Sequence, residues 1–314
     1  MQPPQTTGRI VSVNISTETG TSKTPVPEIE ITALGVAQDA HAGPGNRQVS
    51  MLSSESIDRF AANAGRTFSR GDFAENITTT GIDLSDTGLL DQFHIGEIRL
   101  EVAQLGKKCH GDGCAIFQEV GKCVMPREGI FCRVLQGGVA KENDPIIHVP
   151  RVLKCMVITL SDRAHQGVYA DRSGPRVREH LDAFFVGKRW HPHIDQRVLP
   201  DDAELLRDTL ITARDTGVDI VITTGGTGIG PRDITPDVVT ALADRLIPGI
   251  MEYIRIQSAA SKPNALLSRS VAAVLDKTLV YTLPGSVRAV TEYMDEILKT
   301  VEHVLYMLHD IDAH

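Results

Sequence analysis

The chain has 314 residues, which is enough for two domains with separate cores, and its 41% hydrophobic and 23% charged residues are typical of globular proteins. Its formal net charge of −8 argues against general binding to nucleic acid or to an anionic membrane surface, because both favour a basic protein face. The polar first residues do not follow a signal-peptide pattern and no apolar run reaches the roughly 18 residues of a membrane span, so the sequence predicts a cytoplasmic protein.

The first part of the chain, residues 1–148, is expected to be a β-rich domain. Apolar and polar residues alternate over 9–15, 28–34 and 97–102, as they do in strands that are buried on one face. Turn-forming segments separate these strands, and one helix is predicted over 54–64. Several strands with irregular connections favour a closed or partly closed barrel.

Cysteine is concentrated in this part, with four of the five cysteines between residues 109 and 132. An odd number of cysteines in a large chain without an export signal favours thiols or metal ligands over a disulfide framework. Cys132 falls in a predicted strand and is expected to be a small buried residue. A zinc site is an alternative, although its four candidate ligands lack the Cys-x-x-Cys spacing of most structural zinc sites: Cys109, His110, Cys114 and Cys123.

Two groups of residues resemble the MOSC domain, a module found at the C-terminus of molybdenum cofactor sulfurases and in stand-alone relatives. The first group is Asp39-Ala-His-Ala-Gly43, followed by Arg47–Leu52 and Phe73-Ala-Glu-Asn-Ile77, and the second is Gly106–Cys114 with Gly121–Leu135. The resemblance implies that a cysteine handles a sulfur or molybdenum centre. Cys109 matches that position, either as the carrier of persulfide sulfur or as a contact to the molybdenum cofactor.

The residues around these motifs carry their own chemistry. Lys107 and Lys108 would lower the pKa of the adjacent Cys109 thiol and so favour the thiolate that sulfur or metal chemistry needs. His41 lies in a glycine-rich turn, where a metal ligand and a hydrogen-bonded structural residue are both compatible with the sequence.

The second part, residues 151–314, follows a seam of prolines at 145 and 150 and alternates strands with helices. Such alternation favours an α/β domain with a mostly parallel sheet and helices on both of its faces. Strands are expected at 153–160, 194–199, 220–222, 270–275 and 278–283, the last two as a hairpin around Asp276-Lys277, and helices at 173–185, 201–216, 235–246, 249–260 and 287–309.

A glycine loop lies at the centre of this second part. A short apolar strand, Ile220–Ile222, runs into Thr224-Gly-Gly-Thr-Gly228, and Thr235-Pro-Asp237 then begins a helix with a cap, a proline and an acid. Strand, glycine loop and helix start form anion sites in α/β proteins. The residues that follow fit neither a Walker A loop nor the dinucleotide fingerprint, so taken alone a tight structural turn is as compatible as a phosphate site.

Three further polar loops follow predicted strands: Ser161-Asp162-Arg163, Pro200-Asp201 and Pro284-Gly285-Ser286. The carboxyl ends of parallel strands point to the same edge of a sheet, so these loops should meet the glycine loop there. This convergence favours a ligand site at that edge.

The same segments resemble the MogA/MoaB family, the molybdopterin adenylyltransferases. The matching stretches are Thr159–Arg163 with Asp171-Arg-Ser-Gly174, Pro200–Asp202, Thr224–Gly228 with Arg232-Asp-Ile-Thr-Pro236, and Leu283–Ser286. The superfamily also holds gephyrin-like, MoeA-like and CinA-like relatives. The resemblance implies a homotrimer, essential acids at Asp201 and Asp233, and pterin and phosphate contacts at Ser161, Asp162, Arg163, Asp171, Ser173, Gly225, Gly226, Thr227, Gly228, Thr235, Pro284, Gly285 and Ser286.

The chemistry that the resemblance implies is adenylyl transfer. The terminal phosphate of molybdopterin would attack the α-phosphorus of ATP and displace pyrophosphate, so the protein must supply positioning, a carboxylate-held Mg²⁺ and donors for the phosphates. Asp201 and Asp233 suit the metal. Alternatives remain for single residues: Asp201 fits a helix cap, Asp233 a turn former and Arg163 a surface ion pair.

The two resemblances both indicate molybdenum cofactor biosynthesis. The leading hypothesis is an enzyme that adenylylates molybdopterin, fused to a MOSC domain that binds or sulfurates the cofactor. A molybdate-insertion protein and molybdoenzymes are its implied protein partners. The alternatives are a non-catalytic carrier or sensor of the cofactor and a CinA-like nucleotide hydrolase.

Overall fold

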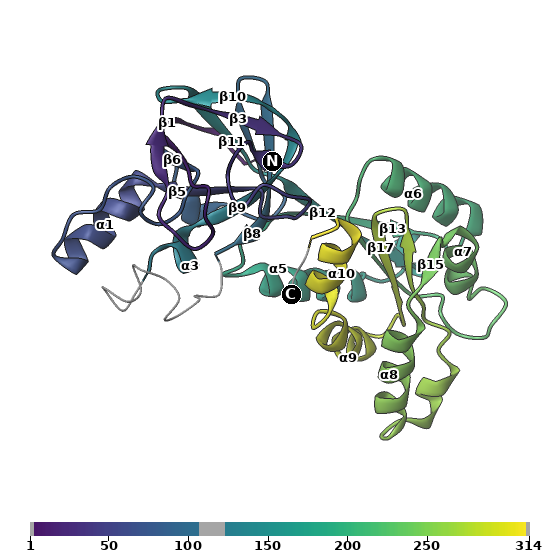
Figure 1. Ribbon diagram of the computed structural model, residues 1–314. Helices are drawn as coiled ribbons and strands as arrows, with labels where there is room; N and C mark the ends of the chain where they lie inside the picture. The colour runs from purple at the N-terminus through teal and green to yellow at the C-terminus, as the bar shows by residue number, and fades with distance from the viewer. Residues whose placement is uncertain (1–2, 107–122, 312–314) are drawn as a thin grey trace. The chain divides into compact units, whose positions relative to one another are not determined.

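The computed structural model describes residues 3–106 and 123–311, and the chain divides into two compact units (Figure 1). The first unit holds the chain up to Arg151 together with 189–191, and the second holds 152–188 and 192–310. None of the helices in the described residues is long and apolar enough to cross a membrane.

The first unit is built on a closed barrel of seven strands. Going round the ring they are β1 (Thr6–Ile15), β11 (Pro145–Val149), β7 (Gln92–Ile95), β8 (Ile98–Leu105), β9 (Ile130–Gln136), β5 (Val49–Ser53) and β6 (Ile77–Thr80). Neighbours pair antiparallel except β5 and β6, and the β1–β11 pairing closes the ring. The expected barrel is therefore confirmed, and the apolar run at the proline seam is the strand that closes it.

Smaller elements complete this unit. β2 (Thr24–Val26) extends the sheet beside β1, and β10 (Gly138–Lys141), β3 (Glu28–Thr32) and β4 (Gly35–Val36) form a second sheet. The helical pieces are α1 (Ser54–Ala64), η1 (Leu84–Asp86) and α3 (Met125–Glu128). α1 has the predicted bounds, because the Ser53 side chain caps its start and Gly65 ends it with a left-handed backbone.

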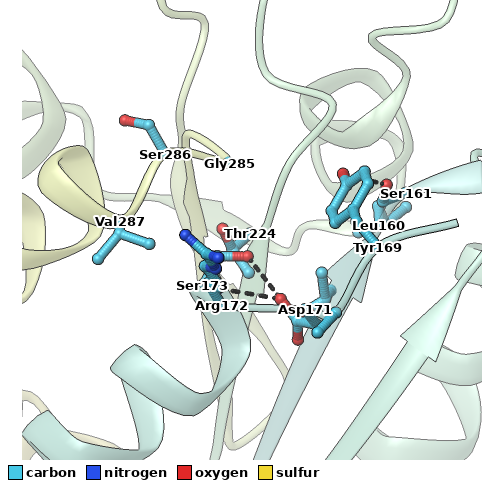
Figure 2. A pocket seen from close by; sticks show the side chains of 12 residues that line it. Leu160, Ser161, Tyr169, Asp171, Arg172, Ser173, Thr224, Gly285, Ser286 and Val287 are labelled. Carbon is cyan, nitrogen blue, oxygen red and sulfur yellow. Dashed lines mark hydrogen bonds between the residues drawn. The ribbon is translucent and has the colours of Figure 1, made fainter. Parts of the chain in front are cut away.

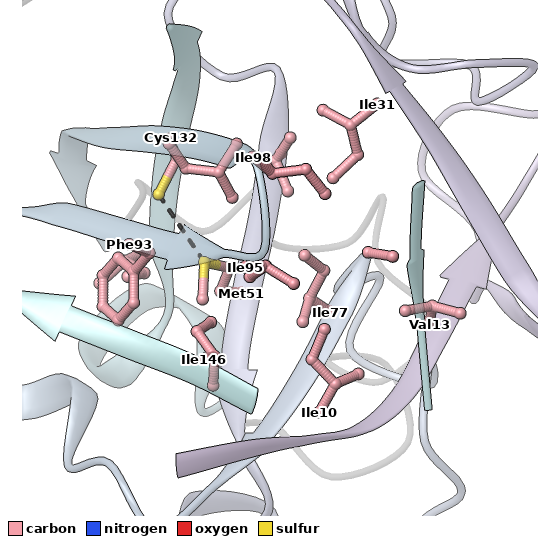
Figure 3. Close-up of a cluster of buried hydrophobic side chains, with 14 of the residues drawn as sticks. Ile10, Val13, Ile31, Met51, Ile77, Phe93, Ile95, Ile98, Cys132 and Ile146 are labelled. Carbon is pink, nitrogen blue, oxygen red and sulfur yellow. Dashed lines mark hydrogen bonds between the residues drawn. The ribbon is translucent and has the colours of Figure 1, made fainter. Parts of the chain in front are cut away.

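Alternate side chains of the strands fill the barrel with apolar groups (Figure 3). Phe93, Ile77 and Met51 are fully buried there. Cys132 lies among them as predicted, with its Sγ 3.8 Å from the Met51 Sδ. Burial raises the pKa of the Cys132 thiol, so this cysteine is a core residue and not a nucleophile.

The second unit contains a six-stranded sheet in the order β13 (His191–Leu199), β12 (Val152–Leu160), β14 (Ile220–Thr224), β17 (Thr278–Leu283), β16 (Ala272–Leu275) and β15 (Arg245–Leu246). β14 pairs parallel with both β12 and β17, whereas β16 pairs antiparallel with β17 and with β15. The sheet is therefore mixed: the expected parallel pairing holds for β12, β14 and β17 but not for β16 and β15. The two-residue turn at Asp276-Lys277 makes the predicted hairpin, and a hairpin must be antiparallel.

Helices cover both faces of this sheet. They are α4 (Asp162–His165), α5 (Ser173–Phe185), α6 (Ala203–Asp215), α7 (Thr235–Leu242), α8 (Pro248–Ala259), α9 (Val287–Ile297) and α10 (Val301–Leu308), with a short η3 (Pro263–Leu267) after α8. Val221 of β14 packs into one core with Leu206 of α6 and Val239 of α7. Its neighbour Ile222 points to the other face, where α5 lies against β12 and β14 and α9 against β17.

Two predicted helices differ from the structure. The helix expected over 235–246 ends at Leu242, and the next residues form the edge strand β15. The helix expected over 287–309 is broken into α9 and α10. At the break the Thr300 hydroxyl donates a hydrogen bond to the Ile297 carbonyl oxygen, a side-chain bond that competes with the helical ladder.

We expect Cys132 and Cys155 to resist thiol reagents in the native protein, because both are buried and burial raises the pKa of both thiols. Cys123, which is only partly buried, should label faster than either. Mass-spectrometric counting of labelled cysteines before and after denaturation checks this. Fast native labelling of Cys132 would contradict the barrel core described above.

Candidate functional site

Two adjoining hollows lie where the parallel strands of the second unit end. The larger, of about 450 Å³, lies between the ends of β12 and β14, the start of α5 and the loop before α9 (Figure 2). The smaller, of about 310 Å³, lies beside it between the loops that follow β12, β13 and β14. Leu160 and Ser161 line both. The predicted convergence of four polar loops at one edge of the sheet is thus observed.

The glycine loop is held against the neighbouring strands by its main chain. Gly225 donates its N–H to the Leu283 carbonyl oxygen at 2.9 Å and has a φ of 103°. A Cβ at this position would lie 2.3 Å from the Leu160 carbonyl oxygen, so only glycine fits. The buried Thr235 closes the loop, since its hydroxyl donates to the Gly225 carbonyl oxygen at 3.0 Å and its N–H to that of Gly226 at 3.1 Å.

One wall of the larger hollow is organised by Asp171. Its Oδ1 accepts the N–H groups of Ser173 and Gly174, at 3.0 and 3.1 Å, which are free at the start of α5. Its Oδ2 accepts the Thr159 hydroxyl at 2.7 Å, and the Ser173 hydroxyl also donates to Oδ1. The carboxylate of Asp171 therefore fixes the wall and has little capacity left for a ligand.

The other walls combine apolar surface with donors. Tyr169 is half exposed, and its hydroxyl lies 2.8 Å from the Ser161 Oγ (Figure 2). The Arg163 guanidinium lies 5.2 Å from the centroid of the Tyr169 ring. Opposite it, Ser286 and Val287 begin α9, whose first N–H groups point out of the helix start. Such a start favours an anionic group.

The smaller hollow gathers three carboxylates: Asp162, Asp201 and Asp233. Asp162 Oδ1 accepts the Asp201 N–H at 2.9 Å, and Asp201 Oδ2 accepts the Asp162 N–H at 3.4 Å, so the loops after β12 and β13 hold each other. In the described residues, Oδ1 of Asp201 and Oδ1 of Asp233 accept no hydrogen bond. Carboxylate oxygens without a protein donor are available to a cation or to a water molecule.

The helix cap proposed for Asp201 belongs to its neighbour. Asp202 Oδ1 accepts the Leu205 N–H at 2.9 Å and caps α6, which begins at Ala203. The turn proposed for Asp233 is present: its Oδ2 accepts the Gly230 N–H at 2.8 Å, and its own N–H donates to the Gly230 carbonyl oxygen. Asp233 therefore closes this turn with one oxygen, while its Oδ1 accepts no hydrogen bond in the described part of the chain.

The remaining predicted residues divide into two groups. Ser161, Asp162, Arg163, Ser173, Gly226, Gly285 and Ser286 line the hollows, as do Asp171, Asp201 and Asp233. Gly225, Thr227, Gly228, Thr235 and Pro284 do not, and they shape the loops behind the lining. The Pro284 carbonyl oxygen, for example, accepts the Thr224 hydroxyl at 3.1 Å.

Sequence reasoning missed three residues of this site. Tyr169 and Arg232 line the hollows, and the Arg232 Nη1 lies 3.5 Å from the Asp162 Oδ2. Arg269 lies behind the glycine loop and donates to its main chain. Arg232 stands inside the matched Arg-Asp-x-Thr-Pro stretch and could have been selected. Nothing local distinguishes Arg269.

The first unit brings residues 39–43 and 73–76, both from the first motif group, together around Asp39. This buried carboxylate forms an ion pair with the buried Lys23 and accepts the Asn76 Nδ2–H at 3.1 Å and the His41 N–H at 3.0 Å. Burial alone would raise the pKa of Asp39, but hydrogen bonds from His41 and Lys23 outweigh it and hold the pKa well below its usual range. The charge of Asp39 is thus firmly maintained.

Glu75 and His41 are the other ionisable residues of these two stretches. Glu75 is fully buried, its Oε1 accepts two donors and its Oε2 none in the described part of the chain, and burial raises its pKa. The His41 side chain is 44% exposed, with Nδ1 3.3 Å from the Asp39 Oδ1. The carboxylate orients the ring, as second partners of ligating histidines do.

Cys109, His110, Cys114, Lys107 and Lys108 lie outside the described residues. Within 3–106 and 123–311, no three histidine, cysteine or carboxylate side chains form a preformed metal site. Of the predicted zinc ligands only Cys123 is described.

Replacing Gly225 by alanine should destabilise the second unit by about 1–3 kcal/mol, because it adds a strained φ and a clash with the Leu160 carbonyl oxygen. Gly217→Ala is the matched control, since Gly217 has a φ of 69° but open space around its missing Cβ. Urea unfolding followed by helical circular dichroism measures both. Equal urea midpoints for Gly225→Ala and Gly217→Ala would show that relief of the clash costs no stability.

Comparison with known proteins assigns each unit to a family. Residues 156–303 match the family described as "Probable molybdopterin binding domain", and residues 37–147 match the MOSC domain. A molybdopterin adenylyltransferase of Haemophilus influenzae is 36% identical over 155 residues, which are 49% of this chain and 77% of that protein. A second, from Helicobacter pylori strain J99, is 31% identical over 48% of this chain and 85% of its own length.

Other relatives match the same half of the chain. Gephyrin of Dictyostelium discoideum is 33% identical over 49% of this chain but only 22% of its own length. A solved structure, the molybdopterin biosynthesis Mog protein of Mycobacterium ulcerans, is 35% identical over 49% of this chain and 98% of its own, with a TM-score of 0.46. Through its second unit the chain belongs to the molybdopterin adenylyltransferase family, and it carries a MOSC domain in its first.

Proposed function

We propose that the second unit transfers the adenylyl group of ATP to molybdopterin in a Mg²⁺-dependent reaction that releases pyrophosphate. Family membership makes the chain an enzyme of molybdenum cofactor biosynthesis. We propose in addition that ATP is the adenylyl donor, that Mg²⁺ is the metal and that individual residues have the roles given below. The observation that carries them is the pair of adjoining hollows, one partly apolar and one lined by three carboxylates.

The larger hollow suits a flat ring and a phosphate. Leu160, Tyr169 and Val287 supply apolar surface, and the start of α9 at Ser286 supplies N–H donors. At the boundary with the smaller hollow, the N–H group of Gly226 donates to no acceptor in the described part of the chain, so it is available to a phosphate oxygen. Such donors would fix the attacking phosphate and the polyphosphate in line.

The smaller hollow fits Mg²⁺ by the chemistry of its donors. Mg²⁺ prefers oxygen ligands and is commonly held by one or two carboxylates, substrate phosphates and water, so a preformed three-ligand cage is not required. Within residues 3–106 and 123–311, Asp201 and Asp233 each have an oxygen without a protein donor. The bound ion would neutralise charge on the phosphates. The nucleophile belongs to molybdopterin, so these residues would position the metal and the phosphates, and no protein group is modified.

We further propose that the first unit binds or sulfurates the cofactor, with Cys109 as its functional thiol. The support within the described residues is Asp39, which accepts hydrogen bonds from His41 and Asn76 and so joins the stretches 39–43 and 73–76. Chains with Cys109→Ser should keep pyrophosphate release by the second unit, which contains no cysteine in its hollows.

The test is pyrophosphate release from ATP by the purified chain, with and without molybdopterin. Release that requires both molybdopterin and Mg²⁺ supports the transferase. Tight binding of molybdopterin without release would identify a carrier or sensor, and hydrolysis of ADP-ribose or a dinucleotide without pterin would identify a CinA-like hydrolase.

Asp201→Asn and Asp233→Asn should each slow pyrophosphate release by about a hundredfold or more, because each removes a charge that faces the polyphosphate. Asp202→Asn is the matched control: it removes an adjacent carboxylate, but asparagine caps a helix as well as aspartate does, so turnover and melting temperature should stay close to wild type. If Asp201→Asn turns over like Asp202→Asn, Asp201 holds no metal.

A homotrimer is the expected assembly, and α8 with η3 offers a surface for it. Tyr253 and Ile256 of α8 are 50% and 68% exposed, and Leu266 and Leu267 of η3 are 59% and 53% exposed. Exposed apolar clusters of this kind mark association surfaces. Ile256→Glu should therefore dissociate the assembly in light scattering, whereas Val186→Glu, at an isolated exposed valine, should not. A stable wild-type monomer at micromolar concentration would refute the trimer.

A further inference from the structure

We propose that Arg269 is a positioning residue of this site, which holds the glycine loop and the Asp233 turn in the geometry that the proposed adenylyl transfer needs. This inference rests on the proposed function. Arg269 lies between η3 and β16 and lines neither hollow, so its action is indirect.

The guanidinium of Arg269 binds the main chain of the loop at two separate points. Its Nε donates to the Gly228 carbonyl oxygen at 2.7 Å, and its Nη2 donates to the Asp233 carbonyl oxygen. The Arg269 N–H also donates to the Thr227 carbonyl oxygen at 2.8 Å. One residue thus satisfies three carbonyl groups of the loop, including the one on the residue that faces the smaller hollow.

The loop has few other ties in this region. Besides the bonds that they accept from Arg269, residues 228–233 donate bonds only within the turn in the described part of the chain, from Gly230 to the Asp233 carboxylate and from Asp233 back to the Gly230 carbonyl oxygen, except that the exposed Arg232 side chain reaches Asp162 at 3.5 Å. The bonds within the turn set its shape but do not join it to the sheet. Arg269 joins it, because the residues beside Arg269 are anchored: Arg255 Nη1 donates to the Ser270 carbonyl oxygen at 2.9 Å, and β16 follows.

The fork geometry of arginine matters here. While Nε and Nη2 bind the loop, Nη1 binds both oxygens of Asp237 in the first turn of α7, at 2.7 and 3.0 Å. Asp237 orients the guanidinium from the far side of the loop. A lysine has one charged nitrogen on a flexible stem and cannot reach all three partners at once, so charge alone should not replace Arg269.

Arg269→Ala should lower kcat/KM for pyrophosphate release by about a hundredfold, the scale expected when a reacting group is misplaced by roughly 1 Å. It should also raise the Mg²⁺ concentration needed for half-maximal rate, because Asp233 is no longer held. Arg269→Lys should restore little of either. A variant that is only less stable would show neither the Mg²⁺ shift nor this failure of lysine.

Arg214→Ala is the matched control. Arg214 is as exposed as Arg269, at 37%, and also pairs with an exposed aspartate, but the structure gives it no bond to the loop. Asp237→Asn provides the second control, since it weakens only the far ion pair and should change the rate by less than about fivefold, the range of an exposed pair. If Arg269→Ala behaves like Arg214→Ala in rate and Mg²⁺ dependence, the proposal is wrong.

Hydrogen exchange separates this proposal from the proposed function. In Arg269→Ala the amides of 226–236 should exchange faster than in wild type, while those of α6 should not change, whether or not the protein adenylylates molybdopterin. Wild-type exchange in 226–236 overturns the positioning role. A wild-type protein that releases no pyrophosphate overturns the proposed function, and faster loop exchange in the variant would then still support the role of Arg269 in holding the loop.

Discussion

The second unit depends on one close contact between main chains. Gly225 lies so near the Leu160 carbonyl oxygen that no side chain fits, and a Cβ on Gly285 would lie 3.4 Å from the Gly225 Cα. Three chain segments that follow β12, β14 and β17 therefore meet with almost no side chain between them. The hollows exist because polar residues on either side of this contact, Ser161 and Ser286, are carried to its rim.

The carboxylates at this rim have two roles, wall stabilisation and the proposed ligand binding, and their hydrogen bonds distinguish the two. Asp171 and Asp202 use their oxygens on N–H groups at helix starts, so they stabilise the walls. Asp201 and Asp233 each have one oxygen that no donor in the described part of the chain reaches. Proximity to the hollow alone would not separate these roles, whereas the number of occupied acceptor sites does.

The sequence predicted those elements whose local signals agree with their packing. α5 has its predicted bounds, since Pro175 fits the first turn of a helix and Asp171 accepts the N–H groups at the same start. The barrel follows from the alternating strands. The helix break at Thr300 was not predicted, since it depends on a single hydrogen bond from the Thr300 hydroxyl to the Ile297 carbonyl oxygen. Asp201 and Asp202 both fit the spacing of a cap, so only coordinates could assign it.

The site was predictable where its residues follow strands and was missed where they act from a distance. Asp162, Asp201 and Ser286 each stand at the end of a strand, and the topology of a sheet brings such residues together. Arg269 contacts the loop through main-chain carbonyl groups, which carry no residue identity. No pattern of side chains could therefore have indicated its partners.

Barrel closure in the first unit has a consequence for folding. The strand that completes the ring pairs Thr6 with His148 and Arg9 with Pro145, residues at opposite ends of the unit. Bringing such distant segments together carries a large loop-closure entropy and slows folding relative to local contacts. During synthesis one edge of β1 stays unpaired until β11 has been made, and an unpaired strand edge can pair with another chain. The N-terminal strand is thus the part of this protein that most needs protection before the ring is complete.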